Sequence, residues 1–154
     1  MNIQVGIITV SDRASSGQYD DLGGPLLKEA ADGYGWSVIT EAVVTDDKEQ
    51  IQRAIREHIA KGAHLVLTTG GTGVAPRDVT PEAFHEVYEK EIAGFGELFR
   101  ALSFQEIGAA AMLSRACAGT TRGKILISIP GSENAVRLAM NKLILSGLVL
   151  ISST

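Results

Sequence analysis

The sequence predicts an α/β protein built on a single doubly wound, mostly parallel sheet with helices on both faces. Short β-branched and aliphatic segments alternate with longer segments in which apolar residues recur at helical spacing. Strands that alternate with helices in this way pair in parallel through right-handed crossovers. The length of 154 residues suits one domain, and a hydrophobic content of 45% is enough for a sizeable core. We therefore expect residues 1–154 to form a single domain.

The first half of the chain predicts two strands, each followed by a helix. The strand segments are rich in apolar and β-favouring residues, which is typical of strands inside a sheet. The second helix has the clearest helical period, and Asp46 with Glu49 three places on has the spacing of a capping box. In chain order we expect a strand over 3–10, a helix within 20–34 that begins nearer Pro25, a strand over 36–44 and a helix over 46–61.

The second half predicts a less regular alternation. Thr80 is placed to cap a helix that has Pro81 in its first position, and Ser132 is placed to cap the last helix. The glycines on either side of Phe95 are expected to interrupt the helical region between these two points. In chain order we expect a strand over 65–69, helices over 81–91 and 97–104, an edge strand within 116–121, a strand over 124–129 and a helix from 132 to about 145.

A glycine-rich turn follows the strand over 65–69 directly. Gly70, Gly71 and Gly73 have no side chains, so the backbone can turn sharply there and let a ligand approach its amides. No Gly-Lys-Ser/Thr sequence follows, which excludes a Walker A loop, and Pro76 stands where a dinucleotide fingerprint needs its third glycine. Taken alone, the cluster indicates either an anion site or a tight turn between a strand and a helix.

Polar segments follow four of the predicted strands. Ligands of doubly wound proteins bind outside the carboxyl ends of the strands, so we expect these segments to meet at one edge of the sheet. A glycine turn that served only as a connection would not need such neighbours. The four segments are Ser11-Asp12-Arg13, Thr45-Asp46-Asp47, the turn from Gly70 to Asp78, and Pro130-Gly131-Ser132.

Composition excludes several classes of function. A formal net charge of −4 argues against a nucleic-acid-binding domain, which needs a basic surface. No basic region precedes the apolar run within residues 1–10, and that run is too short to span a membrane, so we expect a cytoplasmic protein with neither signal peptide nor membrane segment. Cys117 is the single cysteine, which favours a buried core thiol. The scattered His58, His64 and His85 favour packing over metal binding.

Five segments carry a distinctive set of motifs: Ile8-Thr9-Val10-Ser11-Asp12-Arg13, Leu67-Thr68-Thr69-Gly70-Gly71-Thr72-Gly73, Arg77-Asp78-Val79-Thr80-Pro81-Glu82-Ala83, Ser114-Arg115 and Pro130-Gly131. The second and third together are far more specific than any glycine motif alone. Over nearly the whole chain these motifs resemble the MogA/MoaB family of molybdenum cofactor biosynthesis. The compact length is similar to the MoaB branch of that family.

The resemblance implies a molybdopterin-binding fold and an adenylyltransferase. ATP would give its AMP to the terminal phosphate of molybdopterin, pyrophosphate would leave, and Mg²⁺ would assist. The implied assembly is a homotrimer or a hexamer, with contacts to other molybdenum cofactor enzymes, and residues 108–112 and 148–151 are either subunit contacts or ordinary core. Two alternative functions stay open, a non-catalytic molybdopterin carrier or scaffold and a domain for another phosphorylated metabolite. Molybdenum and tungsten both stay open as the eventual metal.

The resemblance also implies the site residues. Asp46 and Asp78 match the family's functionally required aspartates and would catalyse AMP transfer and hold Mg²⁺, which prefers one or two carboxylates plus substrate oxygens. Asp46 could instead cap its helix, which leaves Asp47 as the other candidate acid, and Asp78 could be a turn residue. Asp12 either binds substrate or caps its loop, and Arg115 either clamps an oxyanion or lies on the surface. The implied substrate- and phosphate-binding residues are Ser11, Asp12, Thr69, Gly70, Gly71, Thr72, Gly73, Ser114, Arg115, Pro130, Gly131 and Ser132.

Overall fold

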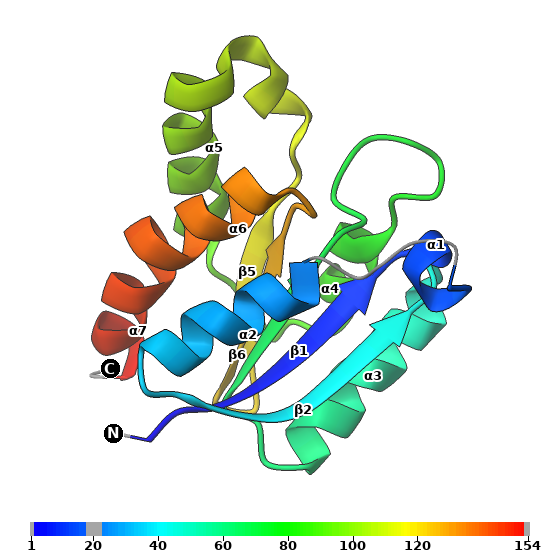
Figure 1. Cartoon of the computed structure of the whole chain (residues 1–154), viewed down its shortest axis with the longest axis vertical. Helices are drawn as coiled ribbons and strands as arrows, with labels where there is room; N and C mark the ends of the chain where they lie inside the picture. Colours follow the sequence, from blue (N-terminus) through cyan, green and yellow to red (C-terminus); the bar gives the residue numbers. More distant parts are fainter. Residues whose placement is uncertain (1, 18–22, 153–154) are drawn as a thin grey trace.

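The structure, a computed structural model, describes residues 2–17 and 23–152. Six strands form one sheet in the order β2-β1-β3-β6-β5-β4 (Figure 1). The strands are β1 (Gln4–Val10), β2 (Ser37–Val44), β3 (Leu65–Thr69), β4 (Lys90–Glu91), β5 (Cys117–Thr121) and β6 (Lys124–Ile129). The helices are α1 (Asp12–Ser15), α2 (Gly23–Gly33), α3 (Lys48–Ala60), α4 (Thr80–His85), α5 (Ala93–Ile107), the 3-10 helix η1 (Gly108–Leu113), α6 (Glu133–Ala139), the π-helical segment η2 (Met140–Ile144) and α7 (Leu145–Ser152).

The sheet confirms the predicted fold class. Strands β2, β1, β3 and β6 run parallel to one another. Strand β5 pairs antiparallel with β6, and β4 pairs antiparallel with β5. From β1 the chain passes through α2 to β2 on one side, and then through α3 to β3 on the other side. This reversal is the switch point of a doubly wound sheet, and it lies between β1 and β3.

Different helices cover the two faces of the sheet (Figure 1). Ile7 belongs to a core that includes Leu27 of α2 and Phe99 of α5, all almost fully buried. The next residue, Ile8, belongs to a second core that includes Ile55 of α3. Neighbouring residues of a strand point to opposite faces, so a strand covered on both sides needs apolar residues throughout. This explains why the central strands consist largely of apolar residues.

The start of α3 differs from the prediction. The N-cap is Asp47, whose carboxylate accepts a hydrogen bond from the Gln50 amide at 3.0 Å, and helical residues begin at Lys48. Asp46 therefore does not cap the helix with Glu49. Its carboxylate accepts instead from the backbone amide of Asp12 in the neighbouring loop. Because Asp46 contacts Asp12, the N-cap position of α3 is taken by Asp47.

Helix α4 is shorter than the predicted helix over 81–91, because it ends at His85. Thr80 is the first helical residue and not the N-cap. Its hydroxyl donates to the carbonyl oxygen of Gly70 at 3.0 Å, so it ties the helix to the glycine turn. Residues 90–91 form the short strand β4 instead of the helix end, since they pair with Gly119 and Thr120 of β5. The segment predicted as an edge strand thus lies inside the sheet, and β4 is the edge.

Helix α5 runs through the two glycines that were expected to interrupt it. A Cβ at Gly96 would lie 2.8 Å from the carbonyl oxygen of Ala116 and 2.6 Å from the guanidinium of Arg100. The missing side chain lets α5 approach the chain just before β5. The glycine here serves close packing and not a break.

The last helical region is also longer than predicted. Ser132 caps it as expected, accepting a hydrogen bond from Ala135 N at 3.1 Å, but helical structure continues through η2 and α7 to Ser152. Leu148 is buried in the core, and the side chains of 149–154 lie outside the described part of the chain. Residues 20–22 of the first predicted helix also lie outside it. Within the described chain, no helix is long and apolar enough to cross a membrane.

Candidate functional site

The carboxyl ends of the parallel strands surround a cavity of about 470 Å³. The loops after β1, β2, β3 and β6 reach it, together with the end of η1. Such an edge, at the reversal of strand order, is where doubly wound proteins bind ligands. The lining residues are Val10, Ser11, Asp12, Arg13, Asp46, Gly70, Gly71, Thr72, Gly73, Arg77, Asp78, Leu113, Ser114, Pro130, Gly131 and Ser132.

Most of the residues implied by the motifs lie together at this cavity. Asp46 lines it, whereas Asp47 caps α3 and does not, so Asp46 is the acid of the pair that lies at the cavity. Thr69 and Arg115 are outside the lining. Thr69 is buried behind the turn, where its hydroxyl donates to the Pro130 carbonyl at 3.3 Å. The implied residues that the fold brings together are Ser11, Asp12, Asp46, Gly70, Gly71, Thr72, Gly73, Asp78, Ser114, Pro130, Gly131 and Ser132.

Two arginines line the cavity although they were not among the implied ligand-binding residues. Arg13 directly follows Asp12, and Arg77 directly precedes Asp78. Their position beside candidate acids, inside segments already expected at the sheet edge, is the signal that could have found them. Leu113 also lines the cavity, and nothing in the sequence around it indicates this.

The glycine turn requires its glycines for steric reasons. Gly70 and Gly71 have positive φ angles of +99° and +70°. A Cβ at Gly70 would lie 2.3 Å from the carbonyl oxygen of Val10, and one at Gly71 would lie 2.3 Å from the hydroxyl oxygen of Thr80. The turn therefore packs tightly between β1 and α4. The tight turn is thus confirmed, and because it also forms a wall of the cavity, an anion site at the same glycines stays a prediction.

Polar groups without a protein partner line the same wall. Within the described residues, the backbone amides of Gly71, Thr72 and Gly73 donate no hydrogen bond to another protein group. The Ser114 hydroxyl is buried and likewise has no partner there. Successive free amides in a turn are donors for an anion such as a phosphate. This wall of the cavity is thus suited to a negatively charged group.

Carboxylates gather across the same cavity. The amide of Asp12 donates to the Asp46 carboxylate at 3.1 Å, and the amide of Asp46 donates to the Asp12 carboxylate at 2.8 Å. Burial raises the pKa of Asp46, and the charges of Asp12 and Asp78 raise it further, while the hydrogen bond from Asp12 and the charge of Arg77 oppose the shift. The ionised form of Asp46 is held at some cost, which a bound cation would relieve.

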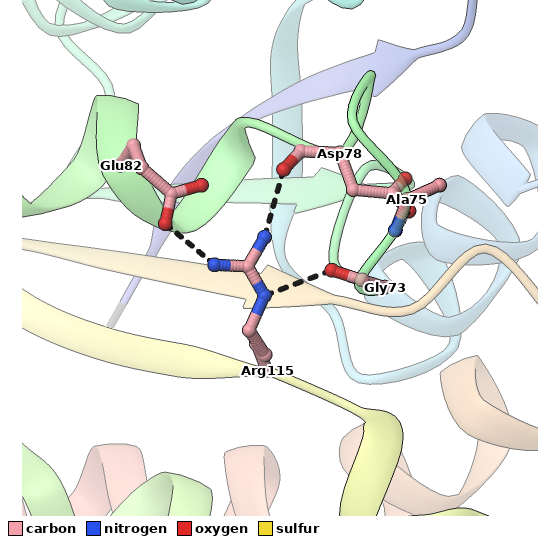
Figure 2. A network of polar contacts seen from close by, with 5 residues as sticks. All are labelled: Gly73, Ala75, Asp78, Glu82 and Arg115. Carbon is pink, nitrogen blue, oxygen red and sulfur yellow. Dashed lines mark hydrogen bonds and ion pairs between the residues drawn. The ribbon is translucent and has the colours of Figure 1, made fainter.

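Arg115 braces the loop that carries Asp78 (Figure 2). Its Nε donates to the Gly73 carbonyl at 2.8 Å, and its Nη2 donates to the Asp78 carbonyl at 2.7 Å. The third nitrogen pairs with Glu82, and this hydrogen bond lowers the pKa of the Glu82 carboxyl. The Asp78 carboxylate accepts from the Ala75 amide at 2.9 Å within the same loop. The Arg115 guanidinium, for which the sequence left an oxyanion clamp and a surface position open, thus contacts three protein acceptors, Gly73, Asp78 and Glu82.

The acids fit a magnesium ion that shares its ligands with a substrate. No group of three or more histidine, cysteine or acidic side chains close enough to cage a metal occurs among the described residues. Mg²⁺ does not need such a cage, because it usually takes one or two carboxylates and completes its shell with water and phosphate oxygens. Asp46 and Asp78, both at the cavity and close enough for their charges to interact, offer that donor set.

The fold and the site together define a class of protein. A doubly wound sheet with free amides, a glycine turn and carboxylates at its carboxyl edge is typical of an α/β protein that binds a phosphorylated ligand. Comparison with known proteins narrows this class, because residues 6–148 match the family described as a probable molybdopterin binding domain. The chain belongs to this family, the MogA/MoaB family of molybdenum cofactor biosynthesis.

Individual relatives agree with the family match. The chain is 48% identical over 145 residues to molybdenum cofactor biosynthesis protein B of Bacillus cereus, covering 93% of this chain and 85% of that protein. It is 43% identical over 139 residues to a molybdopterin adenylyltransferase of Pyrococcus furiosus, covering 88% and 81%. The crystal structure of the tungsten cofactor synthesizing protein MoaB from Pyrococcus furiosus superposes with a TM-score of 0.91 at 38% identity, covering 99% of this chain and 96% of that one.

Proposed function

We propose that the protein binds molybdopterin and transfers AMP from ATP to its terminal phosphate, releasing pyrophosphate. The observation that carries the proposal is the meeting of Asp46 and Asp78 with the free amides of the glycine turn at one cavity. The relative from Pyrococcus furiosus that is named molybdopterin adenylyltransferase supports it.

The chemistry suits the side chains present. An oxygen of the pterin phosphate attacks the α-phosphorus of ATP, a new P–O bond forms, and the bond to the β-phosphate oxygen breaks, so that pyrophosphate leaves with the electron pair. A phosphate monoester is already anionic at neutral pH, so the attack needs no strong general base. The protein has to align two anions and stabilise the charge that develops on the leaving group.

Asp46 and Asp78 would hold Mg²⁺ in this reaction. When bound, the ion supplies positive charge to the phosphate oxygens. The two carboxylates would orient the metal–nucleotide unit from one side of the cavity, while the amides of Gly71 to Gly73 and the Ser114 hydroxyl bind phosphate oxygens of the substrates from the wall beside them. Asp12 would position Asp46 through the hydrogen bonds that join them.

The proposal includes assembly as a trimer or hexamer. Large apolar side chains are exposed along α5 and η1, and such a surface favours burial against another protein. Met112 is 74% exposed, so the predicted contact within 108–112 suits a subunit interface, whereas the buried Leu148 belongs to the core. The exposed apolar residues of this region are Leu98, Phe104, Ile107, Met112 and Leu113.

Incubation of the protein with molybdopterin, ATP and Mg²⁺ tests the proposed function. We expect adenylylated molybdopterin by mass spectrometry and one pyrophosphate for each AMP transferred. Molybdopterin binding without AMP transfer would indicate a non-catalytic carrier or scaffold. Tight ATP binding without molybdopterin affinity would indicate a domain for another phosphorylated metabolite.

A further inference from the structure

Arg77 lies at the cavity on a stretch of backbone that is fixed on both sides. The Asp78 amide donates to the Ala75 carbonyl at 2.9 Å, and the Ala75 amide donates to the Asp78 carboxylate at 2.9 Å. Arg115 in turn holds the Asp78 carbonyl at 2.7 Å. The position from which the Arg77 side chain leaves the loop is therefore set before any ligand arrives.

The Arg77 guanidinium makes no contact of this kind within the described part of the chain. Arg77 is exposed, and no hydrogen bond or ion pair to another described residue engages its guanidinium. By contrast, the guanidinium of Arg115 is occupied by Gly73, Asp78 and Glu82. A guanidinium at a cavity that makes no hydrogen bond or ion pair within the described part of the chain is available for a phosphate, to which it can donate two parallel hydrogen bonds.

The charge at the cavity indicates which phosphate Arg77 serves. Asp12, Asp46 and Asp78 place three acidic side chains at the cavity, and the positive charge of Arg77 lowers the pKa of Asp46 in part. Arg77 thus lies near the two acids that are proposed to hold the metal and, through it, the triphosphate. When the α–β bond breaks, negative charge accumulates on the β- and γ-phosphates, where a cation stabilises the transition state most.

We infer that Arg77 binds the β- and γ-phosphates of ATP and stabilises the leaving pyrophosphate. This inference rests on the proposed function for its substrate, and it adds a residue to which neither the motifs nor the comparisons give a role. The inference assigns Arg77 no contact with the AMP portion of the nucleotide or with the pterin, so binding of these two should not depend on it.

Calorimetric titration of the full chain with magnesium pyrophosphate and with AMP tests the inference. In Arg77→Gln we expect affinity for magnesium pyrophosphate to fall by about tenfold or more, as for loss of a charge-assisted hydrogen bond, and affinity for AMP to stay within about twofold. Arg77→Lys should recover part of the lost affinity for magnesium pyrophosphate, because lysine keeps the positive charge but cannot donate two parallel hydrogen bonds from a planar group. Arg53→Gln, on the exposed side of α3 and outside the cavity lining, removes the same charge and should bind both ligands like wild type.

The outcomes separate this inference from the proposed function. Unchanged pyrophosphate affinity in Arg77→Gln, an equal loss for AMP and pyrophosphate, or a loss as large in Arg53→Gln would each overturn the assignment of Arg77, as would a wild-type protein that binds no magnesium pyrophosphate. A wild-type protein that binds magnesium pyrophosphate through Arg77 but transfers no AMP would overturn the proposed function and leave the contact standing. Thermal unfolding of each variant checks that the fold is retained.

Discussion

The carboxylates of Asp12 and Asp46 are each held by the backbone amide of the other residue, at 2.8 and 3.1 Å. The two residues are 34 positions apart, and the exchange joins the loop after β1 to the loop after β2. It draws Asp46 to the cavity and leaves helix capping to Asp47. The two carboxylates therefore lie near each other, and the charge of Asp12 contributes to the raised pKa of Asp46.

Removal of the Asp46 charge should not destabilise the protein. The pKa of Asp46 is raised, so its ionised form is disfavoured in the fold, and this penalty is absent below the unfolded pKa of about 4 and present above the folded pKa. We expect Asp46→Asn, which keeps an oxygen for the Asp12 amide, to unfold at pH 7 at a temperature no lower than wild type. A fall of several degrees in a calorimetric scan would show that the acid has a structural role.

Replacement of Arg115 should loosen the glycine loop. Arg115→Gln removes the donors to Gly73 and Asp78, and loss of such charge-assisted bonds should reduce the free energy of unfolding by about 2 kcal/mol. Glu82→Gln is the matched control, since it removes only a half-exposed ion pair and should reduce it by less than about 1 kcal/mol. Urea denaturation measures both. If Arg115→Gln unfolded like wild type but lost molybdopterin binding, Arg115 would be the oxyanion clamp after all.

His58 should make stability fall as the pH drops below neutrality. His58 is 2% exposed, its Nε2 contacts the Ile7 carbonyl at 3.0 Å, and burial lowers the pKa of the imidazole despite that hydrogen bond. A lowered histidine pKa gives full stability above the unfolded pKa of about 6.5, and this stability is lost as the pH falls toward the folded pKa. We expect the unfolding temperature of wild type to decrease between pH 7 and 5.5, and His58→Gln to decrease less. The exposed His85→Gln should keep the wild-type slope, and equal slopes in all three proteins would contradict this account.

Cys117 should be inert in the native protein. The thiol is buried, as predicted, and burial raises its pKa to about 11, so almost no thiolate is present at pH 8. Ellman's reagent at pH 8 should therefore modify the unfolded chain rapidly in guanidinium chloride and the native protein at least about a hundredfold more slowly. A native rate close to the unfolded rate would mean that the thiol is accessible.

The architecture and most of the cavity lining were predictable, because both follow from repeating rules. Strands buried on both faces must be apolar, and a doubly wound sheet brings the segments after its parallel strands to one edge. The segments at Asp12, Asp46, Gly71 and Ser132 therefore meet although they are far apart in the chain.

The differences arise where a distant contact decides between local alternatives. Asp46 and Asp47 are both suitable N-cap residues for α3. Only the hydrogen bond from Asp12 to Asp46 shows that Asp47 is the cap. The glycine at 96 is a helix breaker by propensity, but it is needed where α5 meets the Ala116 carbonyl. Arg115 finds its partners 33 to 42 positions away, at a loop whose path no local pattern gives.

AMP transfer in Asp46→Asn, compared with Asp47→Asn, tests the central claim most directly. The two changes remove the same charge from neighbouring residues, and Asn caps a helix about as well as Asp, so α3 stays intact in both variants. We predict that the Asp46 variant loses about a hundredfold or more of the rate while still binding molybdopterin, and that the Asp47 variant stays within about twofold of wild type. Wild-type turnover in Asp46→Asn, or an equal loss in both variants, would contradict a cavity in which Asp46 holds the metal–nucleotide unit.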